Sequence, residues 1–382
     1  MAEAEFSGYD PYDGLNTRHA LLRSTKLTRL ICIYFHKFSP FNLRRIFGVQ
    51  PSTQLQALAF IGLALLSRRS EGDRQSLETI VAEIKKGSLR EKFGFDCWES
   101  HGFPIQMRTG YRPVGIPDIV GNEACGRLLL YWGVENSDEE ALNMAQSFRD
   151  YLLAEFLVER NDGCFFKYKT YLPEYQATYN ASLLGAQYVM EVDHALGYSR
   201  NEATVASAFR FVCDRQKEEG YWNYSVDLNT GAEKPQVDFH QGFILDCLLR
   251  FMEVYGFRKP FIDCYTRGLR FYREQQFMDS GQGIYRWPRK WPVNIHNQAQ
   301  GILTFSRASV LDQENLVIAK RIADWTVAHM RHPDGHFFYL KYPFFSNKIP
   351  YIRWSDAAMA YAFAVYLERA DEGIGSREGS LR

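Results

Sequence analysis

The hydrophobic pattern of the chain predicts two alternating classes of helix. One class is apolar on nearly every face and rich in Ala, Gly and Ser, as in the segments that start at Asn122 (NEACGRLLLYW) and Asn180 (NASLLGAQYVM). Helices of this kind are expected to be buried on all sides. The other class has charged residues on one face and apolar residues at helical spacing on the other, as in 139–157, 201–216, 261–277 and 315–330. We therefore predict buried inner helices that alternate with half-exposed outer helices.

The buried class recurs with a regular period. Polar or aromatic residues open these helices at positions about 58 apart, namely Asn122, Asn180, Asp238, His296 and Trp354. An earlier copy, QLQALAFIGLALL (54–66), precedes the next one by about 66 positions, so six inner helices are expected. Such a period indicates a repeat protein, in which each unit buries its apolar face against its neighbours.

Six inner helices with outer helices between them predict a closed ring. We expect an all-α fold of the (α/α)6 toroid type, with inner helices that begin near 54, 120, 178, 238, 296 and 355. The segment LTRLICIYFHKF (27–38) is the expected sixth outer helix, which would pair the first repeat with the last. No Pro/Gly/Ser-rich linker interrupts the chain, so we predict one toroid domain (21–370) between an N-terminal extension (1–20) and a polar tail (371–382).

A loop motif precedes each inner helix. It contains glycine followed by aromatic and basic residues, as in DGCFFKYK (162–169), EGYWNYSVD (219–227), GQGIYRWPRKW (281–291) and DGHFFYLKY (334–342). Glycine suits a turn and alternating aromatics suit a short extended hairpin. These loops and the N-termini of the inner helices are expected to meet at one mouth of the ring.

Three segments outside the repeats carry a resemblance to known proteins: GYDPYDGLN (8–16), SPFNLRRIFGV (39–49) and FGFDCWESHGFPIQ (93–106). With the repeats, they make the chain resemble the six-hairpin toroids of carbohydrate-active proteins, which include glucuronyl 5-epimerase-type domains, polysaccharide lyases and glycoside hydrolases. The chain also looks like bacterial proteins of exopolysaccharide and cell-surface glycan systems. The resemblance covers nearly the whole chain and implies a role in polysaccharide biosynthesis or modification, possible association with a glycan assembly system, and a saccharide ligand.

The first turns of the inner helices are more polar than helix caps require. Asn and Asp are good caps, whereas His and Gln are poor ones. This excess predicts that a polar site is lined by His240, Gln241, His296, Asn297, Gln298 and Gln300, together with Asn180, Asp238 and Asp356. The alternative is a ring of buried side chains that satisfy the backbone of the loops.

Aromatic and basic residues crowd the same loops. Flat aromatic faces suit the C–H faces of sugar rings, and the predicted sugar-binding aromatics are Trp98, Trp222, Tyr224, Tyr285, Trp287, Trp291, Tyr339 and Trp354. The same side chains could instead plug the loops onto the core. Arginine grips a carboxylate through paired hydrogen bonds. The excess of basic residues, with Arg108, Arg112, Arg286, Arg289, Lys290 and Arg353 among them, therefore favours an anionic saccharide such as a uronate.

Three enzyme mechanisms and one binding role remain open. An epimerase or lyase would remove the proton beside a uronate carboxylate, with His240 or His296 as base, Tyr224, Tyr285 or Tyr339 as acid, and Arg289 or Arg353 as charge neutraliser. A glycoside hydrolase would need two facing carboxyls, drawn from Asp96, Glu99, Asp118, Glu174, Asp238 and Asp356. A terpenoid-cyclase activity ranks last because neither a DxDD motif nor a metal-binding acidic motif occurs. A glycan-binding or scaffold protein would use the same aromatics and arginines.

Charge and cysteine content exclude several other classes. The chain has 45 basic and 45 acidic residues, which disfavours nucleic acid as the main partner. Its seven cysteines are scattered without a CxxC pair, so neither a disulfide framework nor a metal site is expected, and nothing suggests a cofactor. The most apolar segment, 54–66, is too short to span a bilayer. The polar, acidic start of the sequence predicts a cytoplasmic location.

Overall fold

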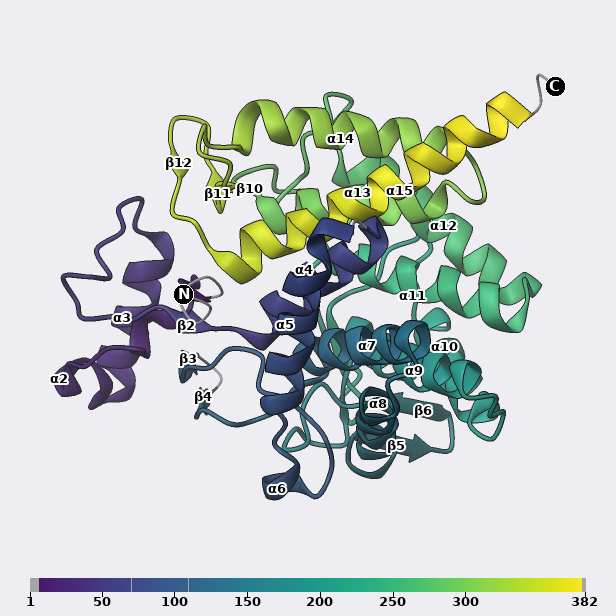
Figure 1. The fold of residues 1–382 in the computed structure, drawn as a ribbon, viewed down its shortest axis with the longest axis horizontal. Helices are drawn as coiled ribbons and strands as arrows, with labels where there is room; N and C mark the ends of the chain where they lie inside the picture. Colours follow the sequence, from purple (N-terminus) through teal and green to yellow (C-terminus); the bar gives the residue numbers. More distant parts are fainter. Residues whose placement is uncertain (1–6, 70, 109, 380–382) are drawn as a thin grey trace.

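The computed structural model describes residues 7–69, 71–108 and 110–379, and its helices form a double ring (Figure 1). Consecutive inner helices contact each other, and the last contacts the first, so the ring is closed. The inner helices are α4 (Leu55–Arg68), α7 (Ile119–Asn136), α9 (Tyr179–Ala195), α11 (His240–Tyr255), α13 (Ile295–Ala308) and α15 (Ala358–Gly379). The predicted all-α toroid and the predicted starts of its inner helices are confirmed.

The outer helices cover the ring from outside, and each one packs on the inner helix before it. They are α5 (Arg74–Lys86), α8 (Glu139–Tyr151), α10 (Glu202–Cys213), α12 (Lys259–Gln276) and α14 (Glu314–Met330). Burial separates the two classes as predicted: α9 is buried at every position from Tyr179 to Asp193, whereas α12 buries one stripe that includes Phe261, Tyr265 and Tyr272.

Small residues allow the helices of the ring to approach closely. A Cβ atom at Gly62 of α4 would lie 2.5 Å from a methyl carbon of Leu128 on α7. At Gly301 of α13, a Cβ would lie 2.3 Å from the Phe277 ring. The Gly- and Ala-rich composition of the inner helices is therefore a packing requirement.

Short strands form the predicted hairpins at the rim. Three motif loops contribute β6 (Gly163–Phe166), β8 (Ser225–Asp227) and β11 (Leu340–Lys341), while the 281–291 loop has only the isolated bridges Phe277↔Gly283 and Arg286↔Arg289. Antiparallel sheets connect adjacent repeats: β8 lies between β7 (Gln176–Thr178) and β9 (Glu233–Lys234), and β11 lies between β10 (Val293–Asn294) and β12 (Ser346–Asn347). The remaining pairs are β1 (Ser7–Gly8) with β2 (Ser52–Thr53), β3 (Ile105–Met107) with β4 (Gly110–Arg112), and β5 (Leu157–Arg160) with β6.

The N-terminal helix does not occupy the sixth outer position, so that part of the prediction is wrong. Helix α3 (Lys26–Phe38) packs on η1 (Asp13–Leu15), α2 (Ala20–Arg23) and β3, while α15 and α4 contact each other directly. A second hydrophobic cluster joins this segment to the β3 hairpin through Leu15, Cys32, Ile33, Phe103 and Ile105. We call residues 15–50 the N-terminal lobe. It projects from the ring on the side of the mouth (Figure 1).

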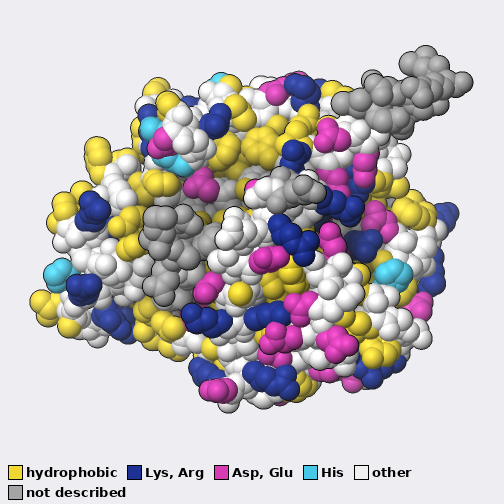
Figure 2. All heavy atoms as spheres, in the orientation of Figure 1, with side chains coloured by type: hydrophobic (Ala, Val, Ile, Leu, Met, Phe, Trp, Pro, Cys, Tyr) yellow, Lys and Arg dark blue, Asp and Glu magenta, His cyan; other side chains and the backbone are white. Residues whose placement is uncertain are grey.

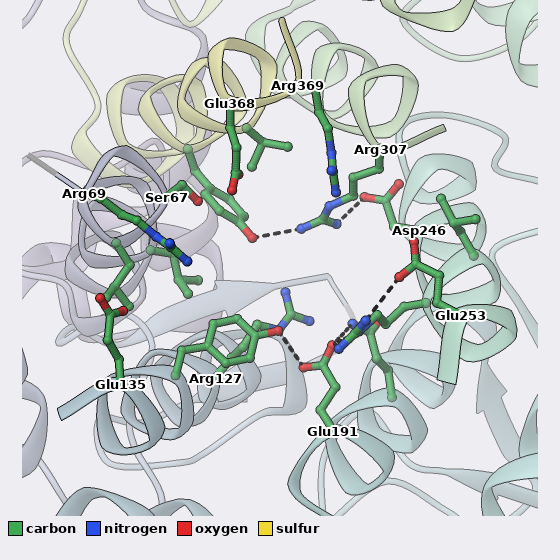
Figure 3. Close-up of a pocket in the computed structure, with 18 residues that line it drawn as sticks. Ser67, Arg69, Arg127, Glu135, Glu191, Asp246, Glu253, Arg307, Glu368 and Arg369 are labelled. Carbon is green, nitrogen blue, oxygen red and sulfur yellow. Dashed lines mark hydrogen bonds and ion pairs between the residues drawn. The ribbon is translucent and has the colours of Figure 1, made fainter. Parts of the chain in front are cut away.

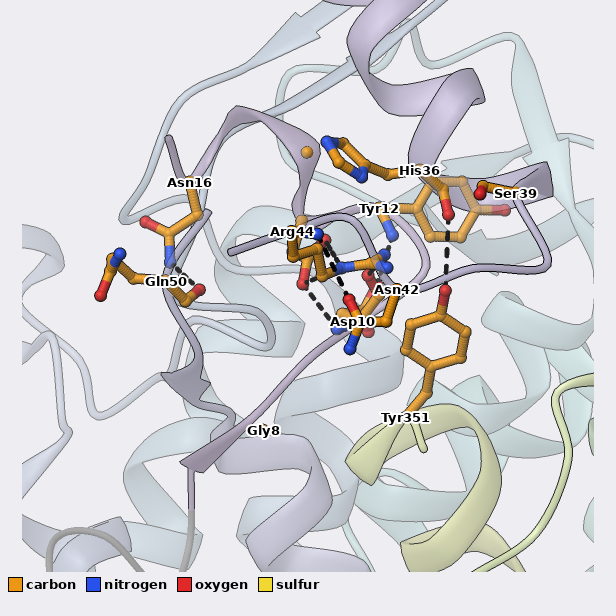
Figure 4. Close-up of polar contacts among 12 residues, drawn as sticks. Gly8, Asp10, Tyr12, Asn16, His36, Ser39, Asn42, Arg44, Gln50 and Tyr351 are labelled. Atoms are coloured by element: carbon orange, nitrogen blue, oxygen red, sulfur yellow. Dashed lines mark hydrogen bonds and ion pairs between the residues drawn. The ribbon is translucent and has the colours of Figure 1, made fainter. Parts of the chain in front are cut away.

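Buried ion pairs attach the lobe to the last repeat, and Figure 4 shows Arg44 and Asp10 of this network. The Arg44 Nε donates to Asp13 Oδ1 (2.7 Å), and its Nη2 donates to the Asp10 carbonyl (2.8 Å). The Asp10 carboxylate in turn pairs with Arg353 (2.7 Å), in the turn that precedes α15. Burial raises the pKa of Asp13 to about 7, although Arg44 opposes that shift. The 8–16 and 39–49 segments, which carried the resemblance, therefore hold the lobe in place.

Helix α15 continues to Gly379 and so runs through residues 371–379 of the predicted polar tail. Before α15, residues Ile352–Ala357 form a π-helical turn, η4, that carries Arg353 and Trp354 toward the mouth.

Candidate functional site

A cavity of about 340 Å³ opens at the end of the ring where the inner helices begin. Its walls come from the motif loops, from the β3–β4 hairpin and from the N-terminal lobe. Seven of the residues predicted as site residues line it: Tyr224, Asp238, His240, Tyr285, Tyr339, Arg353 and Trp354. The predicted mouth therefore exists, and these seven residues make up about a third of its twenty lining residues.

Asp238 and His240 form a hydrogen-bonded pair at the start of α11. The His240 Nδ1 contacts Asp238 Oδ1, and the other carboxylate oxygen accepts a bond from Gln236 Nε2 (2.9 Å) and lies 3.4 Å from Arg286 Nε. Burial acts to raise the pKa of Asp238, but His240 and Arg286 outweigh it and hold this pKa below its usual range. Asp238 is therefore an ionised carboxylate that orients the imidazole.

This pairing leaves one nitrogen of His240 for chemistry. A carboxylate on Nδ1 favours the tautomer with hydrogen on Nδ1, so that Nε2 is an acceptor. Within the described residues, no hydrogen bond engages Nε2. Tyr224 packs edge-on against the ring, with centroids 4.8 Å apart. Burial raises the pKa of Tyr224, so its hydroxyl stays protonated as a donor beside the base.

Six cationic side chains line the same cavity. Three are arginines paired with carboxylates: Arg353 with Asp10, Arg112 with Asp118, and Arg286 with Asp238. The other three are Lys37, Lys169 and Lys234, for which the described part of the chain offers no carboxylate in ion-pair contact. Burial lowers the pKa of each of these lysines. The cavity thus holds partly desolvated positive charge that an anionic ligand would neutralise.

His296 lies just below the mouth and not on its wall. Its ring packs against Phe239 and Trp354, with centroids 4.6 and 4.8 Å away, and lines a smaller space of about 40 Å³ along the ring axis. Burial and the nearby Arg353 lower its pKa to about 3, so the ring is neutral. Its Nδ1 is buried without a partner. His240 and His296 both contact Phe239, which separates them.

Several predicted site residues bond the backbone of the loops. Gln241 accepts from the Trp222 N–H (2.8 Å) and donates to its carbonyl (2.9 Å), and Gln298 does the same with Gly283 N–H (2.7 Å) and the Gly281 carbonyl (3.1 Å). Asp356 accepts from the Phe337 N–H (2.8 Å). None of these side chains lines the mouth cavity. The extra polar residues of the first helical turns therefore serve in large part to hydrogen-bond each inner helix to the loop before it, and this contact is repeated around the ring.

Other predicted residues also lie outside the cavity. Trp98 and Trp222 are fully buried and donate their indole N–H to the carbonyls of Ile84 and Val212. Asn297 donates to the Ile284 carbonyl, and Asn180 is buried without lining the mouth. Trp287, Trp291 and Arg289 belong to the 281–291 loop and do not line the cavity. Arg289 is exposed and donates to the Trp291 carbonyl.

Sequence reasoning missed part of the lining, chiefly Tyr12, Lys37, His101, Tyr168, Lys169, Lys234 and Asn294. Tyr168 and Lys169 end the first motif loop, at a position where aromatic and basic residues recur, so the repeat pattern contained that signal. Tyr12 and Lys37 come from the N-terminal segment. Because part of that segment was predicted to be an outer helix, these two residues were not expected at the mouth.

Asp356 provides a test of these loop bonds that does not depend on activity. Burial raises its pKa to about 6, so the folded state holds the proton more tightly than the unfolded chain. The protonated Asp356 carboxyl should therefore stabilise the wild type below about pH 4, and this contribution should be lost as the pH rises to about 6. Asp356→Asn keeps an acceptor for Phe337 N–H but does not ionise. Its melting temperature relative to wild type should rise between pH 4 and pH 7; a constant difference would contradict the assigned environment.

A second cavity, of about 330 Å³, lies at the other end of the ring (Figure 3). Charged side chains from the inner helices meet there. Glu191 of α9 accepts from Gln187 (2.8 Å) and Tyr131 (3.1 Å), and it pairs with Arg127 of α7 and Arg250 of α11 (3.3 Å each). Arg307 of α13 pairs with Asp246 (2.7 Å) and donates to the Tyr361 hydroxyl (2.8 Å). These contacts connect five of the inner helices, so we assign the cluster a structural role.

Comparisons with known proteins give the fold. Neither a protein-family model nor a curated protein matches the sequence. Among solved structures, the chain is similar to cellobiose 2-epimerase from Bacillus thermoamylovorans B4167 (TM-score 0.67, 11% identity, covering 84% of this chain and 90% of that one). It is also similar to the GH76 α-mannanase BT2949 of Bacteroides thetaiotaomicron (TM-score 0.63, 12% identity, 85% and 88% covered) and to a family 105 glycoside hydrolase from C. acetobutylicum ATCC 824 (TM-score 0.61, 12% identity, 84% and 94% covered).

The described residues contain no helix that is both long and apolar enough to cross a membrane. At these identities the similarity establishes architecture. The chain therefore has the (α/α)6 toroid fold of carbohydrate-active enzymes, as the resemblance predicted, with a cationic cavity at the mouth where His240 and Asp238 lie.

Proposed function

We propose that this chain is an enzyme that acts on a carbohydrate in the mouth cavity. The neighbours in fold are named as epimerases, an isomerase and glycoside hydrolases. The cavity has the size of a small saccharide site, and the rings of Tyr285, Tyr339 and Trp354 line it. The observation that carries the proposal is the Asp238–His240 pair, because it orients the imidazole in the cavity with its Nε2 outside any hydrogen bond of the described residues and with Tyr224 beside it.

The charge of the cavity supports an acidic substrate. Lys37, Lys169 and Lys234 bring positive charge that no carboxylate in ion-pair contact offsets within the described chain, and burial makes each ammonium group more costly than in water. A uronate carboxylate would restore this balance. Lys234 is the best-placed candidate because its Nζ lies 4.3 Å from the centre of the Tyr224 ring, next to His240.

The proposed reaction starts with proton abstraction at the carbon beside the uronate carboxylate. The His240 Nε2 takes the proton, and the electron pair of the broken C–H bond moves into the carboxylate, whose negative charge the cations stabilise. Return of a proton to the opposite face gives the epimer. Expulsion of the oxygen substituent two carbons from the carboxylate gives an unsaturated sugar, with Tyr224 donating the proton to the departing oxygen.

Hydrolysis by a carboxylate pair is less well supported. Such an enzyme places one carboxyl on each side of the glycosidic bond. Among the described residues that line the mouth, Asp238 is the single carboxylate, and it is held by His240, Gln236 and Arg286. Asp356, Asp118 and Asp96, which were candidates for the pair, lie outside the lining.

Incubation in deuterated water tests the proposal. The substrates are uronate-containing oligosaccharides, with cellobiose as a neutral comparison. We expect deuterium at the carbon beside the carboxylate, or an unsaturated product, from the acidic substrates only. Cleavage without deuterium incorporation would replace the proposal with a hydrolase, and exchange in cellobiose alone would replace the acidic substrate with a neutral one. No reaction across the panel would favour a binding protein.

Lys234→Met should weaken the binding of an acidic substrate. Hydrogen bonds to charged groups contribute about 1.5–3 kcal/mol, which corresponds to a rise in KM of roughly 10- to 150-fold. Lys234→Arg keeps the charge and should retain most of the affinity. Lys290→Met is the matched control and should leave KM unchanged, because Lys290 is exposed on the 281–291 loop and lies outside the cavity. Equal effects of the Lys234 and Lys290 substitutions would contradict a carboxylate contact at Lys234.

A further inference from the structure

Helix α3 exposes an apolar stripe to solvent. Leu27, Ile31, Phe35 and Phe38 lie at helical spacing on one face, and 67%, 58%, 42% and 49% of their surfaces are exposed. The opposite face, with Cys32, Ile33 and His36, is buried against the lobe. Two faces of the helix are therefore apolar. The inward face packs on the lobe, and the outward face is exposed to solvent.

Neighbouring segments extend this apolar surface. Leu21 before α3, and Phe41 and Ile46 after it, are 82%, 71% and 74% exposed. The adjacent β11–β12 turn carries Phe344, which is 99% exposed, and Asn347 of the same hairpin donates to the Ser39 carbonyl (3.2 Å). Isolated exposed apolar residues are normal, but a gathering of this kind on one projecting lobe marks an interaction surface.

The charge of the lobe is one-sided. Between Asp13 and Glu71 the sequence contains no acidic residue, whereas residues 15–50 contain Arg18, Arg23, Lys26, Arg29, Lys37, Arg44 and Arg45. The whole chain is neutral, with 45 residues of each sign, so the acidic excess lies elsewhere. On the face that Figure 2 shows, the lobe presents hydrophobic and basic side chains side by side.

We propose that the N-terminal lobe docks on a membrane surface with anionic lipid headgroups. Exposed aromatic and aliphatic side chains flanked by Lys and Arg are the composition that inserts into the headgroup boundary, where basic residues meet anionic lipid. A second copy of the chain is a poorer occupant, because two such lobes would bring like charges together. The surface also lies on a projection, which suits a flat bilayer better than it suits the groove of another protein.

Docking would hold the mouth beside the bilayer, since Tyr12 and Lys37 at the base of the lobe line the mouth cavity. On the basis of the proposed function, the saccharide would then be one presented at a membrane, such as a lipid-linked glycan. Binding to vesicles is measured without any saccharide. A failure of docking and a failure of the proposed reaction are therefore separate results.

Vesicle co-sedimentation of the full chain tests the docking. We expect binding to vesicles of phosphatidylcholine with phosphatidylglycerol at low salt, and much weaker binding to phosphatidylcholine alone. Each basic residue near an anionic surface contributes about fivefold in affinity, so Arg23→Gln with Lys26→Gln should weaken binding by about 25-fold. Arg210→Gln with Arg270→Gln, at exposed positions of α10 and α12, is the charge-matched control and should bind like wild type.

An apolar pair separates insertion from simple charge attraction. Phe41→Ser with Ile46→Ser should weaken vesicle binding at least tenfold, whereas Val317→Ser with Val327→Ser, at exposed positions of α14, should not. Unchanged melting temperatures would show that the variants are folded. Absence of binding to anionic vesicles, or equal losses in the control pairs, would overturn the proposal. A concentration-dependent dimer that the Phe41/Ile46 pair abolishes would replace the membrane with a second copy.

A separate cluster of possible metal ligands lies in the turn between α14 and β11. The Nδ1 atoms of His332 and His336 lie 2.9 and 2.6 Å from Asp334 Oδ1, and one ligand atom of each residue lies within 4.8 Å of the other two. The two rings stack with centroids 4.6 Å apart. The side chains therefore converge on one point at the protein surface.

The bonding of His336 indicates what belongs at that point. Its Nε2 lies 2.8 Å from the Lys348 carbonyl, which can only accept, so the hydrogen of a neutral ring is on Nε2. The Nδ1 of a neutral ring then has a lone pair that faces a carboxylate oxygen, and the two repel unless Nδ1 takes up a proton or both atoms coordinate a metal ion. A histidine whose far nitrogen donates to a backbone carbonyl is the usual arrangement for a metal ligand.

We infer that His332, Asp334 and His336 bind a divalent transition-metal ion, with zinc as the probe. Two imidazoles and a carboxylate with an open position suit zinc. This site departs from the expectation of no metal, which considered cysteine pairs and clusters and not the spacing in HPDGH. Its ion would cross-link the turn before Phe338 and Tyr339, outside the mouth cavity.

Titration calorimetry with zinc chloride on the metal-free chain tests this site. We expect one ion per chain, and at least tenfold weaker binding in His332→Ala and in His336→Ala. His194→Ala, at an exposed histidine at the end of α9, is the control and should bind like wild type. Absence of stoichiometric binding, or the same affinity in all variants, would leave a protonated His336 paired with Asp334 as the explanation of the geometry.

Discussion

His240→Ala is expected to lower the rate of deuterium exchange at the uronate carbon by about 100- to 10,000-fold, the usual contribution of a positioned general base. Among the described residues that line the mouth, His240 is the histidine that combines a buried carboxylate on one nitrogen with a second nitrogen free to face the cavity. Because the reaction needs a base but binding does not, KM should change much less than kcat. Solvent exchange followed by mass spectrometry measures the rate.

Two further substitutions separate the base from its support. Asp238→Asn retains the packing but allows the imidazole to take the other tautomer, so it should also reduce kcat strongly. His296→Ala should have a smaller effect, because its neutral ring lies below the mouth between Phe239 and Trp354. If His296→Ala abolished exchange and His240→Ala did not, the roles of the two histidines would have to be reversed.

Glu191→Leu is expected to lower the free energy of unfolding by about 3–5 kcal/mol, the typical cost of removing one partner of a buried ion pair. Glu191 is 3% exposed and receives Arg127, Arg250, Gln187 and Tyr131, so its loss leaves Arg127 buried without this carboxylate. Urea unfolding measures the change. Glu253→Gln removes an exposed partner of Arg250 and should cost less than about 1 kcal/mol.

The pH dependence of this effect has a definite sign. Burial acts to raise the pKa of Glu191, but Arg127 and Arg250 outweigh it, so the pKa of Glu191 in the folded state is below its usual value. The stabilisation is therefore full above the unfolded pKa of about 4.5 and is lost as the pH falls below it. The difference between wild type and Glu191→Leu should shrink on acidification. Arg127 also pairs with the buried Glu123, so Arg127→Met combined with Glu191→Leu should recover only part of the lost stability. No recovery at all would argue against the buried charge of Arg127 as the cause.

The polar residues of the inner helices show how far the repeat pattern could be interpreted. Slots equivalent in sequence are equivalent in the ring, so the pattern correctly brought Tyr224, Asp238, His240 and Trp354 to one mouth. It could not separate side chains that face the cavity from those that face the preceding loop. His240 and Gln241 are adjacent in sequence, yet one lines the mouth and the other bonds the backbone of Trp222. That difference is a rotation of about 100° around the helix, and both residues are polar.

The N-terminal segment shows a different limit. Its amphipathic pattern was sufficient to predict a helix at 27–38, but an apolar stripe has the same appearance whether it faces a ring or solvent. The position of α3 depends on the Arg44–Asp13 bond, which spans 31 positions, and on the Arg353–Asp10 bond, which spans 343. No local pattern contains such contacts. The position of Lys37 and Tyr12 at the mouth could therefore be recognised only in the tertiary structure.

The sequence by itself determined the architecture, because the period of about 58 residues and the two classes of helix can be recognised along the chain without knowledge of any tertiary contact. It also determined the residue types at the mouth, since aromatic and basic residues recur before each inner helix. Only the tertiary structure decided which of them share a cavity, which carboxylates are neutralised by arginines, and where the first helix lies. Those properties depend on side-chain direction and on distances of a few ångströms between residues remote in sequence, and burial then sets their charge.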